Sequence, residues 1–363
     1  MLTADTQPSR RATTLLYAPG MAYRAVVRLR NALYDAGYLK ARHLPCSVIS
    51  IGNLTVGGTG KTPVTAYLAG MLSESGYRVA VLSRGYRRRS GKRPLLVADG
   101  HALLADAEEA GDEPYLIARL NPAVAVAVGA DRVRASRLVC AVSSPEVILL
   151  DDAFQHRPVH RDLNLLLVDG RHPWGNGKMI PLGPLREPPS AVSRADALIV
   201  TRGDGRCPDD LRTVLARHHP RLDLFHLRLQ PDGYVRADGE EVGPAALKGF
   251  SVFAFSGIAR PDRFEDDLRS LGVRLAGARR YPDHHHYRRR DLEDIVRLAR
   301  DAGAEALVTT EKDLTRGIGV DDRALPCYAL RLRIDPVGGS ALSAFVLEKL
   351  RCLAARPRDG GTR

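Results

Sequence analysis

The amino-acid sequence predicts an α/β protein built on a mainly parallel sheet, with a second, smaller α/β domain after it. Short apolar runs that read as strands alternate with segments of helical pattern along the first half of the chain. Strands buried on both faces have continuous apolar runs, and their alternation with helices is typical of a parallel sheet. The predicted strands of the first domain are 47–51, 79–82, 123–128, 147–150, 163–168 and 197–200.

Length and composition agree with this fold class. The chain has 363 residues, which suits two domains, and 44% of them are hydrophobic, as in ordinary folded proteins. Its 54 Lys and Arg residues exceed its 42 Asp and Glu residues, so the net charge is +12. That excess predicts an anionic partner, or else a solvated basic surface. The five cysteines form no CxxC pair, which indicates neither a zinc site nor a disulfide framework and favours a reducing compartment.

Residues 1–44 are predicted to be an amphipathic segment that associates with a membrane. A helix is expected over residues 15–39, with a break near Pro19-Gly20. Arg24 and Arg28 are interleaved with apolar residues, a pattern typical of helices that lie on anionic membranes. The alternative is a helix that packs on the domain and leaves its arginines in water. No stretch reaches the roughly 20 apolar residues that span a bilayer.

A glycine-rich loop follows strand 47–51 and precedes a helix expected over 63–75. In this context backbone N–H groups surround phosphate oxygens, and the helix N-terminus favours negative charge. Thr55 stands where the generic phosphate loop has Gly, and Val56 where the GGxGKT variant usually has Lys. Lys61 is expected to reach the β- and γ-phosphates, and Thr62 to bind Mg²⁺. The predicted nucleotide-binding residues are Thr55, Val56, Gly57, Gly58, Thr59, Gly60, Lys61 and Thr62.

Two acidic residues close the strand 147–150. Asp151 and Asp152 stand where a P-loop protein carries the carboxylates that hold Mg²⁺ directly or through water. The alternative is an aspartate that caps a turn at a strand end. Together with the glycine loop, the pair indicates a P-loop domain over residues 45–205.

The rest of the chain divides by composition. Residues 206–248 are rich in charged residues, Pro and Gly, and are predicted to be a connecting segment. The second α/β domain is predicted over 249–335, with strands at 252–255 and 307–310 and a helix over 262–271. Residues 336–363 are predicted to be a C-terminal helix and tail.

Beyond the loop, the sequence resembles the tetraacyldisaccharide 4′-kinases of lipid A synthesis. The resemblance runs in order from about residue 45 to residue 315. The motifs that carry it are GNLTVGGTGKTP (52–63), SRGY (83–86), GDEP (111–114), DDAFQH (151–156), GPLREP (183–188), RADA (194–197), FSGI (255–258), PDHH (282–285) and TEKD (310–313).

The resemblance implies transfer of phosphate from ATP, with Mg²⁺, to the 4′-hydroxyl of tetraacyldisaccharide 1-phosphate, giving lipid IVA. This acceptor is an anionic lipid in an anionic leaflet, which gives the positive charge of the chain a purpose. The protein is then expected to be a monomer in peripheral contact with the cytoplasmic face of the bacterial inner membrane, with no nucleic-acid partner.

The resemblance also implies a catalytic pair. A sugar hydroxyl is a weak nucleophile, so transfer benefits from a base that accepts its proton. Asp112 is the candidate base, and His284 is expected to orient it across a cleft between the two domains. Pro114 biases Glu113 toward an extended conformation, so this motif is expected on a turn rather than inside a helix. The alternatives are a helix-capping Asp112 and a metal site formed by the run His284, His285 and His286.

Lys61, Asp151 and Asp152 complete the predicted catalytic set. Tyr86, Glu113 and Arg132 are the predicted substrate-binding residues, and Arg132 resembles a family position near the phosphates. For Arg132 the alternative is a surface salt bridge.

A P-loop regulatory ATPase or GTPase acting at a membrane is the rival function. A GTPase is expected to carry an Asn-Lys-x-Asp motif, and the nearest sequence has Glu311 in place of the Asn. A nucleic-acid module is indicated by charge alone, without a zinc pattern or an aromatic RNA-binding signature.

Overall fold

The computed structural model describes residues 10–86, 88–203, 205–236, 238–316, 325–337 and 339–355. The strands are β1 (Ser47–Asn53), β2 (Val79–Ser83), β3 (Leu95–Asp99), β4 (Ala125–Val128), β5 (Val147–Leu150), β6 (Leu163–Asp169), β7 (Ala197–Thr201), β8 (Asp223–Arg236), β9 (Glu241–Val242), β10 (Ser251–Ser256), β11 (Arg274–Arg280), β12 (Ala306–Thr310) and β13 (Cys327–Val337). The helices are α1 (Arg10–Asp35), α2 (Lys61–Glu74), α3 (Ala107–Ala110), α4 (Asp112–Leu120), α5 (Arg132–Ser143), α6 (Asp209–His218), α7 (Pro261–Ser270), α8 (Arg289–Asp301), α9 (Glu311–Leu314) and α10 (Ala341–Ala354), with a 3-10 helix η1 (Pro189–Arg194).

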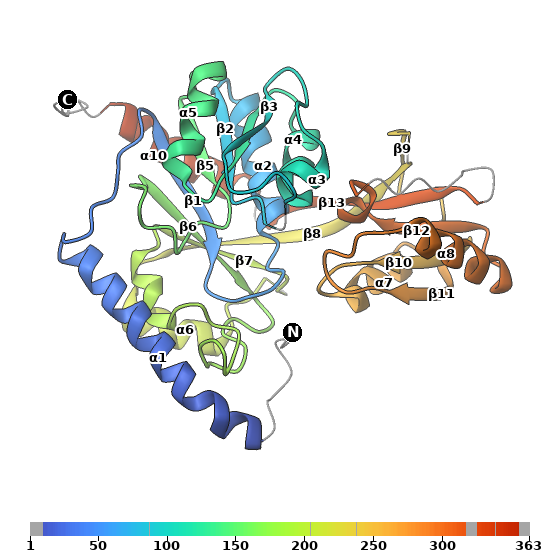
Figure 1. Cartoon of the computed structure of the whole chain (residues 1–363), viewed down its shortest axis with the longest axis horizontal. Helices are drawn as coiled ribbons and strands as arrows, with labels where there is room; N and C mark the ends of the chain where they lie inside the picture. Colours follow the sequence, from blue (N-terminus) through green and yellow to red (C-terminus); the bar gives the residue numbers. More distant parts are fainter. Residues whose placement is uncertain are drawn as a thin grey trace.

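All described strands belong to one sheet. Their order is β11-β10-β12-β13-β8-β7-β6-β1-β5-β2-β4-β3, and β9 pairs with β8 (Figure 1). Neighbouring strands are parallel, except for the pairs β3–β4, β8–β9 and β8–β13. The prediction of a mainly parallel α/β fold is therefore confirmed.

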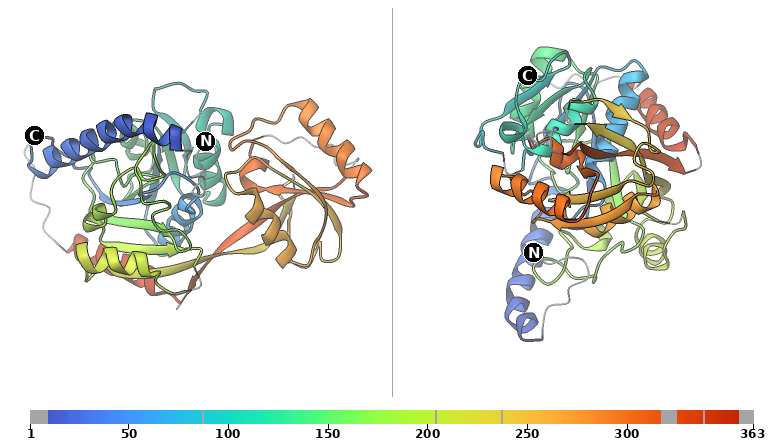
Figure 2. Two further views of the ribbon diagram at one scale, coloured as in Figure 1. Left: turned by 90° about the horizontal axis from the view of Figure 1, so that it is seen from below. Right: turned by 90° about the vertical axis from the view of Figure 1, so that its right-hand side faces the viewer.

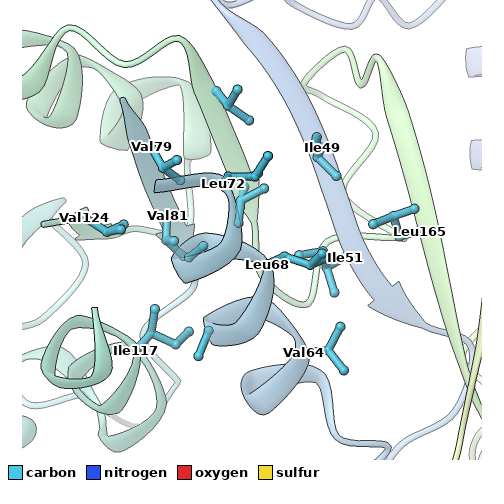
Figure 3. Packing of buried hydrophobic residues seen from close by; sticks show 14 of the residues in the cluster. Ile49, Ile51, Val64, Leu68, Leu72, Val79, Val81, Ile117, Val124 and Leu165 are labelled. Carbon is cyan, nitrogen blue, oxygen red and sulfur yellow. The ribbon is translucent and has the colours of Figure 1, made fainter. Parts of the chain in front are cut away.

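The first half of the sheet has β1 at its centre, between β5 and β6. Helices cover both of its faces. Val64, Leu68 and Leu72 of α2 point toward the strands in Figure 3, and all three are fully buried. Each such side chain contributes about 2 kcal/mol through its burial. This packing fixes α2 against β1, so the loop that joins them has a rigid base.

The two halves of the sheet meet at a ribbon formed by β8 and β13, which run antiparallel from 226–236 to 328–337. Strand β8 also pairs in parallel with β7, so it belongs to both halves (Figure 1). The prediction that 206–248 is a connecting segment is wrong, because this segment contains α6 and β8, one of the two strands of the ribbon. The missed signal is an alternation in which Leu227 and Leu229 are buried and Arg228 between them is exposed.

Helix α1 runs without interruption from Arg10 to Asp35, so the predicted break at Pro19-Gly20 is wrong. A proline inside a helix removes one backbone hydrogen bond. Packing compensates for this loss, since Gly20 lies against Leu182 and the Tyr23 hydroxyl donates a hydrogen bond of 3.0 Å to the Arg186 carbonyl. The helix lies along one side of the first half in both views of Figure 2.

Gly52 lies at a tightly packed position of β1. A Cβ at this position would lie 2.5 Å from the backbone nitrogen of Phe154 and 2.8 Å from its Cβ. We expect Gly52→Ala to lower the free energy of unfolding by about 3 kcal/mol, because the backbone of Phe154 cannot move away without a large energetic cost. Gly243→Ala is the matched control, since no atom lies within 4 Å of its Cβ position. Chemical denaturation measures both, and equal stabilities for the two variants would contradict the prediction.

Candidate active site

The glycine loop lies at the carboxyl end of β1 and opens α2. Gly60 forms the N-cap of α2 with φ 83°, and Gly57 has φ 120°, which is the left-handed region that glycine tolerates best. Asn53 donates a hydrogen bond of 2.9 Å to Thr59 Oγ1, and Thr201 Oγ1 donates one of 2.9 Å to the Thr59 carbonyl. These contacts hold the loop in place beside the N-terminus of α2, where unpaired N–H groups favour an anion.

Lys61, the first residue of α2, reaches back over the loop. Its Nζ donates to Asn53 Oδ1 at 3.3 Å and lies 3.7 Å from Asp152 Oδ1. The side chain is 12% exposed and lines the cleft together with Thr62. The structure thus brings together Lys61, Thr62 and Asp152. Asn53, which sequence reasoning did not single out, is the last residue of β1 and orients both the lysine and the loop.

Asp151 and Asp152 follow β5, the strand next to β1. Asp151 is buried and accepts hydrogen bonds from Thr65 Oγ1 at 3.1 Å and Ser83 Oγ at 3.0 Å. Burial, reinforced by the negative charges of Glu113 and Asp152, raises the pKa of Asp151 to about 6. Negative charge is therefore concentrated at this edge of the sheet.

Asp152 has a different environment from Asp151. Its backbone is left-handed, with φ 46°, and its two oxygens accept from Arg186 Nη1 at 2.9 and 3.0 Å. Burial raises the pKa of Asp152, but Lys61 and Arg186 outweigh burial and the pKa is lowered overall. Arg186 comes from the Gly/Pro-rich loop before η1, and its role as the partner of Asp152 was not predicted.

Arg132 is the first residue of α5 and is only 2% exposed. Its guanidinium donates to the Gly129 carbonyl at 2.6 Å and to the Asp151 carbonyl at 3.4 Å. The alternative of a surface salt bridge is therefore wrong. Burial lowers the pKa of Arg132 to about 10, so it is charged at neutral pH beside the carboxylates.

Asp112 is the first residue of helix α4, and Gly111 is the N-cap with φ 91°. The expectation that this motif lies on a turn outside a helix is wrong. Pro114 is the third residue of the helix, where its missing N–H would have no intrahelical partner in any case. The helix-capping alternative is wrong too, because the capping position belongs to Gly111.

Asp112 is paired with the other half of the sheet. His284 Nδ1 lies 3.0 Å from Asp112 Oδ2, and Arg316 Nη2 lies 2.5 Å from the same oxygen. Lys312 Nζ is 3.7 Å away. Burial raises the pKa of Asp112, but the hydrogen bond from His284 and the charges of Lys312 and Arg316 outweigh it and lower the pKa well below its usual value. The structure thus joins Asp112 of the first half of the sheet to His284 of the second half.

Lys312 lies at the centre of this contact between the halves. Its Nζ is 3.2 Å from Glu113 Oε1, 3.6 Å from Asp283 Oδ1 and 3.4 Å from His284 Nε2. Lys312 and Arg316 were not among the predicted site residues. Lys312 belongs to the TEKD motif, one of those that carry the family resemblance, but the sequence assigned it no role at the site.

The three adjacent histidines point to different partners. His284 contacts Asp112, whereas His285 Nε2 lies 3.1 Å from Asp291 Oδ2. In the part of the chain that the structure describes, no three His, Cys, Asp or Glu side chains gather as a metal site would require. The different partners of His284 and His285 therefore give no support to a metal site formed by residues 284–286.

A cleft of about 1390 Å³ joins these groups. It extends from the glycine loop to the second half of the sheet and to the inner face of α1. Tyr86, 6.4 Å from His284 between ring centroids, lies at its edge. The predicted residues that line the cleft are Val56, Gly57, Gly58, Thr59, Gly60, Lys61, Thr62, Tyr86, Glu113, Arg132, Asp151, Asp152 and His284. Thr55 and Asp112 are not among them. Thr55 pairs with Leu185 in a short β-bridge, and Asp112 lines a smaller pocket that it shares with Tyr86 and His284.

Comparison with known proteins identifies the family. The family model described as tetraacyldisaccharide-1-P 4′-kinase (LpxK) matches residues 12–351. The tetraacyldisaccharide 4′-kinase of Syntrophus aciditrophicus is 42% identical over 353 residues, covering 93% of each chain, and that of Geobacter sulfurreducens is 41% identical, covering 91% of each. A crystal structure of LpxK from Aquifex aeolicus in complex with ATP superimposes with a TM-score of 0.75 at 34% identity, covering 93% of this chain and 99% of that one. The expected kinship is confirmed: the chain belongs to the tetraacyldisaccharide 4′-kinase family.

Proposed function

We propose that this chain transfers the γ-phosphoryl group of ATP to the 4′-hydroxyl of tetraacyldisaccharide 1-phosphate, giving lipid IVA. One observation carries the proposal: the glycine loop of the first half of the sheet and His284 of the second half line the same cleft, and His284 Nδ1 lies 3.0 Å from Asp112. A nucleotide site alone would also suit a regulatory ATPase. A base held by the other half is what transfer to a second substrate requires.

The loop and its neighbours are proposed to bind the triphosphate. Backbone N–H groups of 57–62 and the ammonium of Lys61 contact the β- and γ-phosphates. Arg132, buried and charged beside the Asp151 carbonyl, stabilises the negative charge of the transferring group. Lys61 is already held by Asn53, so little rearrangement is needed when the nucleotide binds.

The residues beside the loop fit a magnesium ion. Burial and the charges of Glu113 and Asp152 raise the pKa of Asp151, and a dication at this place would relieve that repulsion. Thr62, Asp151 and Asp152 would hold Mg²⁺, which when bound neutralises phosphate oxygens. Two carboxylates and a hydroxyl suffice, because Mg²⁺ takes its other ligands from phosphates and water.

Asp112 is proposed to accept the hydroxyl proton of the acceptor. The 4′-oxygen forms a bond to the γ-phosphorus, and the bond from that phosphorus to the bridging oxygen of ADP breaks. Because the pKa of Asp112 is lowered, the carboxylate is ionised and able to accept a proton at neutral pH. A weak base is adequate here, since a loose phosphoryl-transfer transition state requires little early removal of the proton. His284 holds the carboxylate in position.

The acceptor is proposed to enter along α1. The inner face of α1 lines the cleft through Tyr23, Val27, Arg30 and Tyr34. Asn31 donates a hydrogen bond of 2.7 Å to the buried Glu187, so the helix is tied to the loop that carries Arg186. Tyr86 and Glu113 then border the sugar at the far end of this path.

Peripheral contact with an anionic membrane is part of the proposal. Helix α1 exposes Val26 and Leu29, at 64% and 63%, together with the exposed Arg24 and Arg28. Apolar residues flanked by arginines suit a helix lying at the surface of an anionic leaflet. None of the helices over the described ranges is long and apolar enough to cross a bilayer.

We expect Val26→Asp combined with Leu29→Asp to reduce binding to anionic vesicles by at least about tenfold, since each carboxylate opposes insertion and is repelled by the lipid. Activity on acceptor dispersed in detergent should stay near the unmodified level. Val142→Asp on α5 is the control, because Val142 is also exposed but lies on another helix. Unchanged vesicle sedimentation of the α1 variant would show that α1 does not dock on lipid.

Arg316 sets the charge state of the base. We expect Arg316→Met to move the acid limb of kcat/KM to higher pH by about one unit, because loss of a cation raises the pKa of Asp112 toward its ordinary value. Protonation then removes the base at a less acidic pH than in the unmodified protein. Arg316→Lys keeps the charge and should keep the profile of the unmodified protein. Identical acid limbs for the Met variant and the unmodified protein would refute this effect.

The direct test is incubation of the purified protein with ATP, Mg²⁺ and detergent-dispersed tetraacyldisaccharide 1-phosphate. We expect a product that carries a new phosphate at the 4′-position, with ADP formed in equal amount. ATP hydrolysis that proceeds equally well without the acceptor, and no phosphorylated lipid, would favour a regulatory ATPase instead.

A further inference from the structure

The cleft continues past the glycine loop on the side away from Asp151 and Asp152. In the sheet, β5 flanks β1 on one side, and β6 and then β7 lie on the other. Ligands of open α/β sheets bind outside the carboxyl ends of the strands where the strand order reverses. If the γ-phosphate points toward Asp152 and Asp112, the nucleoside end must leave the loop over β6 and β7.

Arg202 occupies that position. It directly follows β7, has a left-handed backbone with φ 61°, and lines the cleft. Its Nη1 lies 3.5 Å from Asp169 Oδ2 at the end of β6, which fixes the side chain. Its Nη2 lies 3.8 Å from the point where a Cβ on Gly58 would stand, so the guanidinium borders the glycine loop directly. Its buried Nε has no hydrogen-bond partner among the described residues.

A second arginine, from the other half of the sheet, lines the same cleft as Arg202. Arg263 lies in the first turn of α7 and its Nε is 3.7 Å from Asp267 Oδ2. Both arginines line the same cleft, and the positive charge of Arg263 adds to the burial that lowers the pKa of Arg202 to about 10. Like charges held near each other in a partly buried cleft indicate that an electron-rich or anionic group belongs between them.

The walls around this pair are apolar. Leu229 of the ribbon, Ile258 and Phe264 line the same cleft as the two arginines. Leu229 is also the side chain closest to Gly60 of the loop, where a Cβ would lie 3.4 Å from it. A flat aromatic group fits such a surface, because guanidinium planes stack on aromatic faces while aliphatic side chains cover the edges.

From these contacts we infer that Arg202 and Arg263 form a two-sided clamp for the nucleoside of ATP, with Arg202 contributed by the first half of the sheet and Arg263 by the second. The inference rests on the proposed function for the direction of the triphosphate. Asp169 and Asp267 act as positioning residues, since each pairs with one of the two guanidinium groups. Binding of the nucleoside thereby joins the two halves at a second place, apart from Asp112 and His284.

The test compares binding of ATP with binding of inorganic tripolyphosphate, each with Mg²⁺ and without acceptor. Arg263→Lys keeps the charge but loses the flat guanidinium, so we expect ATP to bind about tenfold more weakly and tripolyphosphate to bind within about twofold of the unmodified protein. Arg263→Ala should weaken ATP binding at least as much. Arg269→Lys is the control, because Arg269 lies on the same helix, pairs with Asp266 at 2.7 Å and faces away from the cleft.

Two results would overturn the inference. If ATP binds to both Arg263 variants within twofold of the unmodified protein, the nucleoside does not lie at this place. If ATP and tripolyphosphate weaken by the same factor in Arg263→Lys, the side chain contacts phosphate and not the nucleoside. A chain that binds ATP through the clamp but phosphorylates no lipid would refute the proposed function and leave the clamp standing.

Discussion

Asp112→Ala is expected to lower kcat by about 1000-fold, within the range that a positioned general base contributes. ATP should still bind within about twofold of the unmodified protein, because Asp112 lines the smaller pocket beside His284 and not the cleft at the glycine loop. Loss of the carboxylate leaves Arg316 and His284 without their shared partner, so the fold must be checked by circular dichroism. Single-turnover measurement of lipid phosphorylation gives the rate.

Two comparisons sharpen this prediction. Asp301→Ala removes an exposed aspartate from α8 and should turn over normally. If Asp112 and His284 act as one unit, the double variant Asp112→Ala with His284→Ala should be no slower than Asp112→Ala alone. A normal rate for Asp112→Ala would refute its assignment as the base, and additive losses would separate the roles of the two residues.

Lys61→Ala is expected to lower kcat by about 100- to 1000-fold, as removal of one preorganised cationic donor does in other active sites. The ammonium contacts both Asn53 and Asp152, so its loss also leaves the carboxylate with Arg186 as its remaining close cation. The KM for ATP should rise, since the β- and γ-phosphates lose a ligand. Steady-state kinetics at varied ATP separates the two effects.

Lys248→Ala serves as the control for Lys61→Ala, because Lys248 is exposed and does not line the cleft. Lys61→Arg keeps the charge on a larger, planar group and should recover little activity, since the loop holds a compact ammonium. A fully active Lys61→Ala variant would mean that the glycine loop does not bind the transferred phosphate.

Most of the parallel strands could be predicted because they are short apolar runs buried on both faces. Strand β11, also parallel, was missed because it is rich in Arg and mostly exposed. Strand β13 could not be predicted, because Arg331 and Arg333 interrupt its apolar residues, and its order comes from pairing with β8. The helix at Asp112 was missed because a local preference before Pro114 was given more weight than the capping position of Gly111. Strand β13 thus depends on its pairing with a distant strand, whereas the start of α4 depends on the conformation of Gly111.

The site likewise contains residues that the sequence predicted and residues that only the folded structure reveals. Loop residues such as Lys61 and Thr62 are contiguous, and their chemistry follows from spacing alone. Arg316 could not be found from spacing, because its partner Asp112 lies 204 positions away along the chain and the contact exists only after both halves have folded. Asn53 and Arg186 are ordinary polar residues whose importance depends on the side chain that each one contacts.

The ribbon of β8 and β13 makes the second half of the sheet an insertion within the first. The chain leaves the first half along β8 and returns along β13 to place α10 against α2, where Leu342, Val346 and Leu350 complete the core behind the glycine loop. On a ribosome, the nucleotide-binding half therefore cannot close its core until the inserted half has been made. A fragment that ends before α10 lacks part of the packing on which the phosphate site rests, so the two halves are not separable by cutting the chain at a single point.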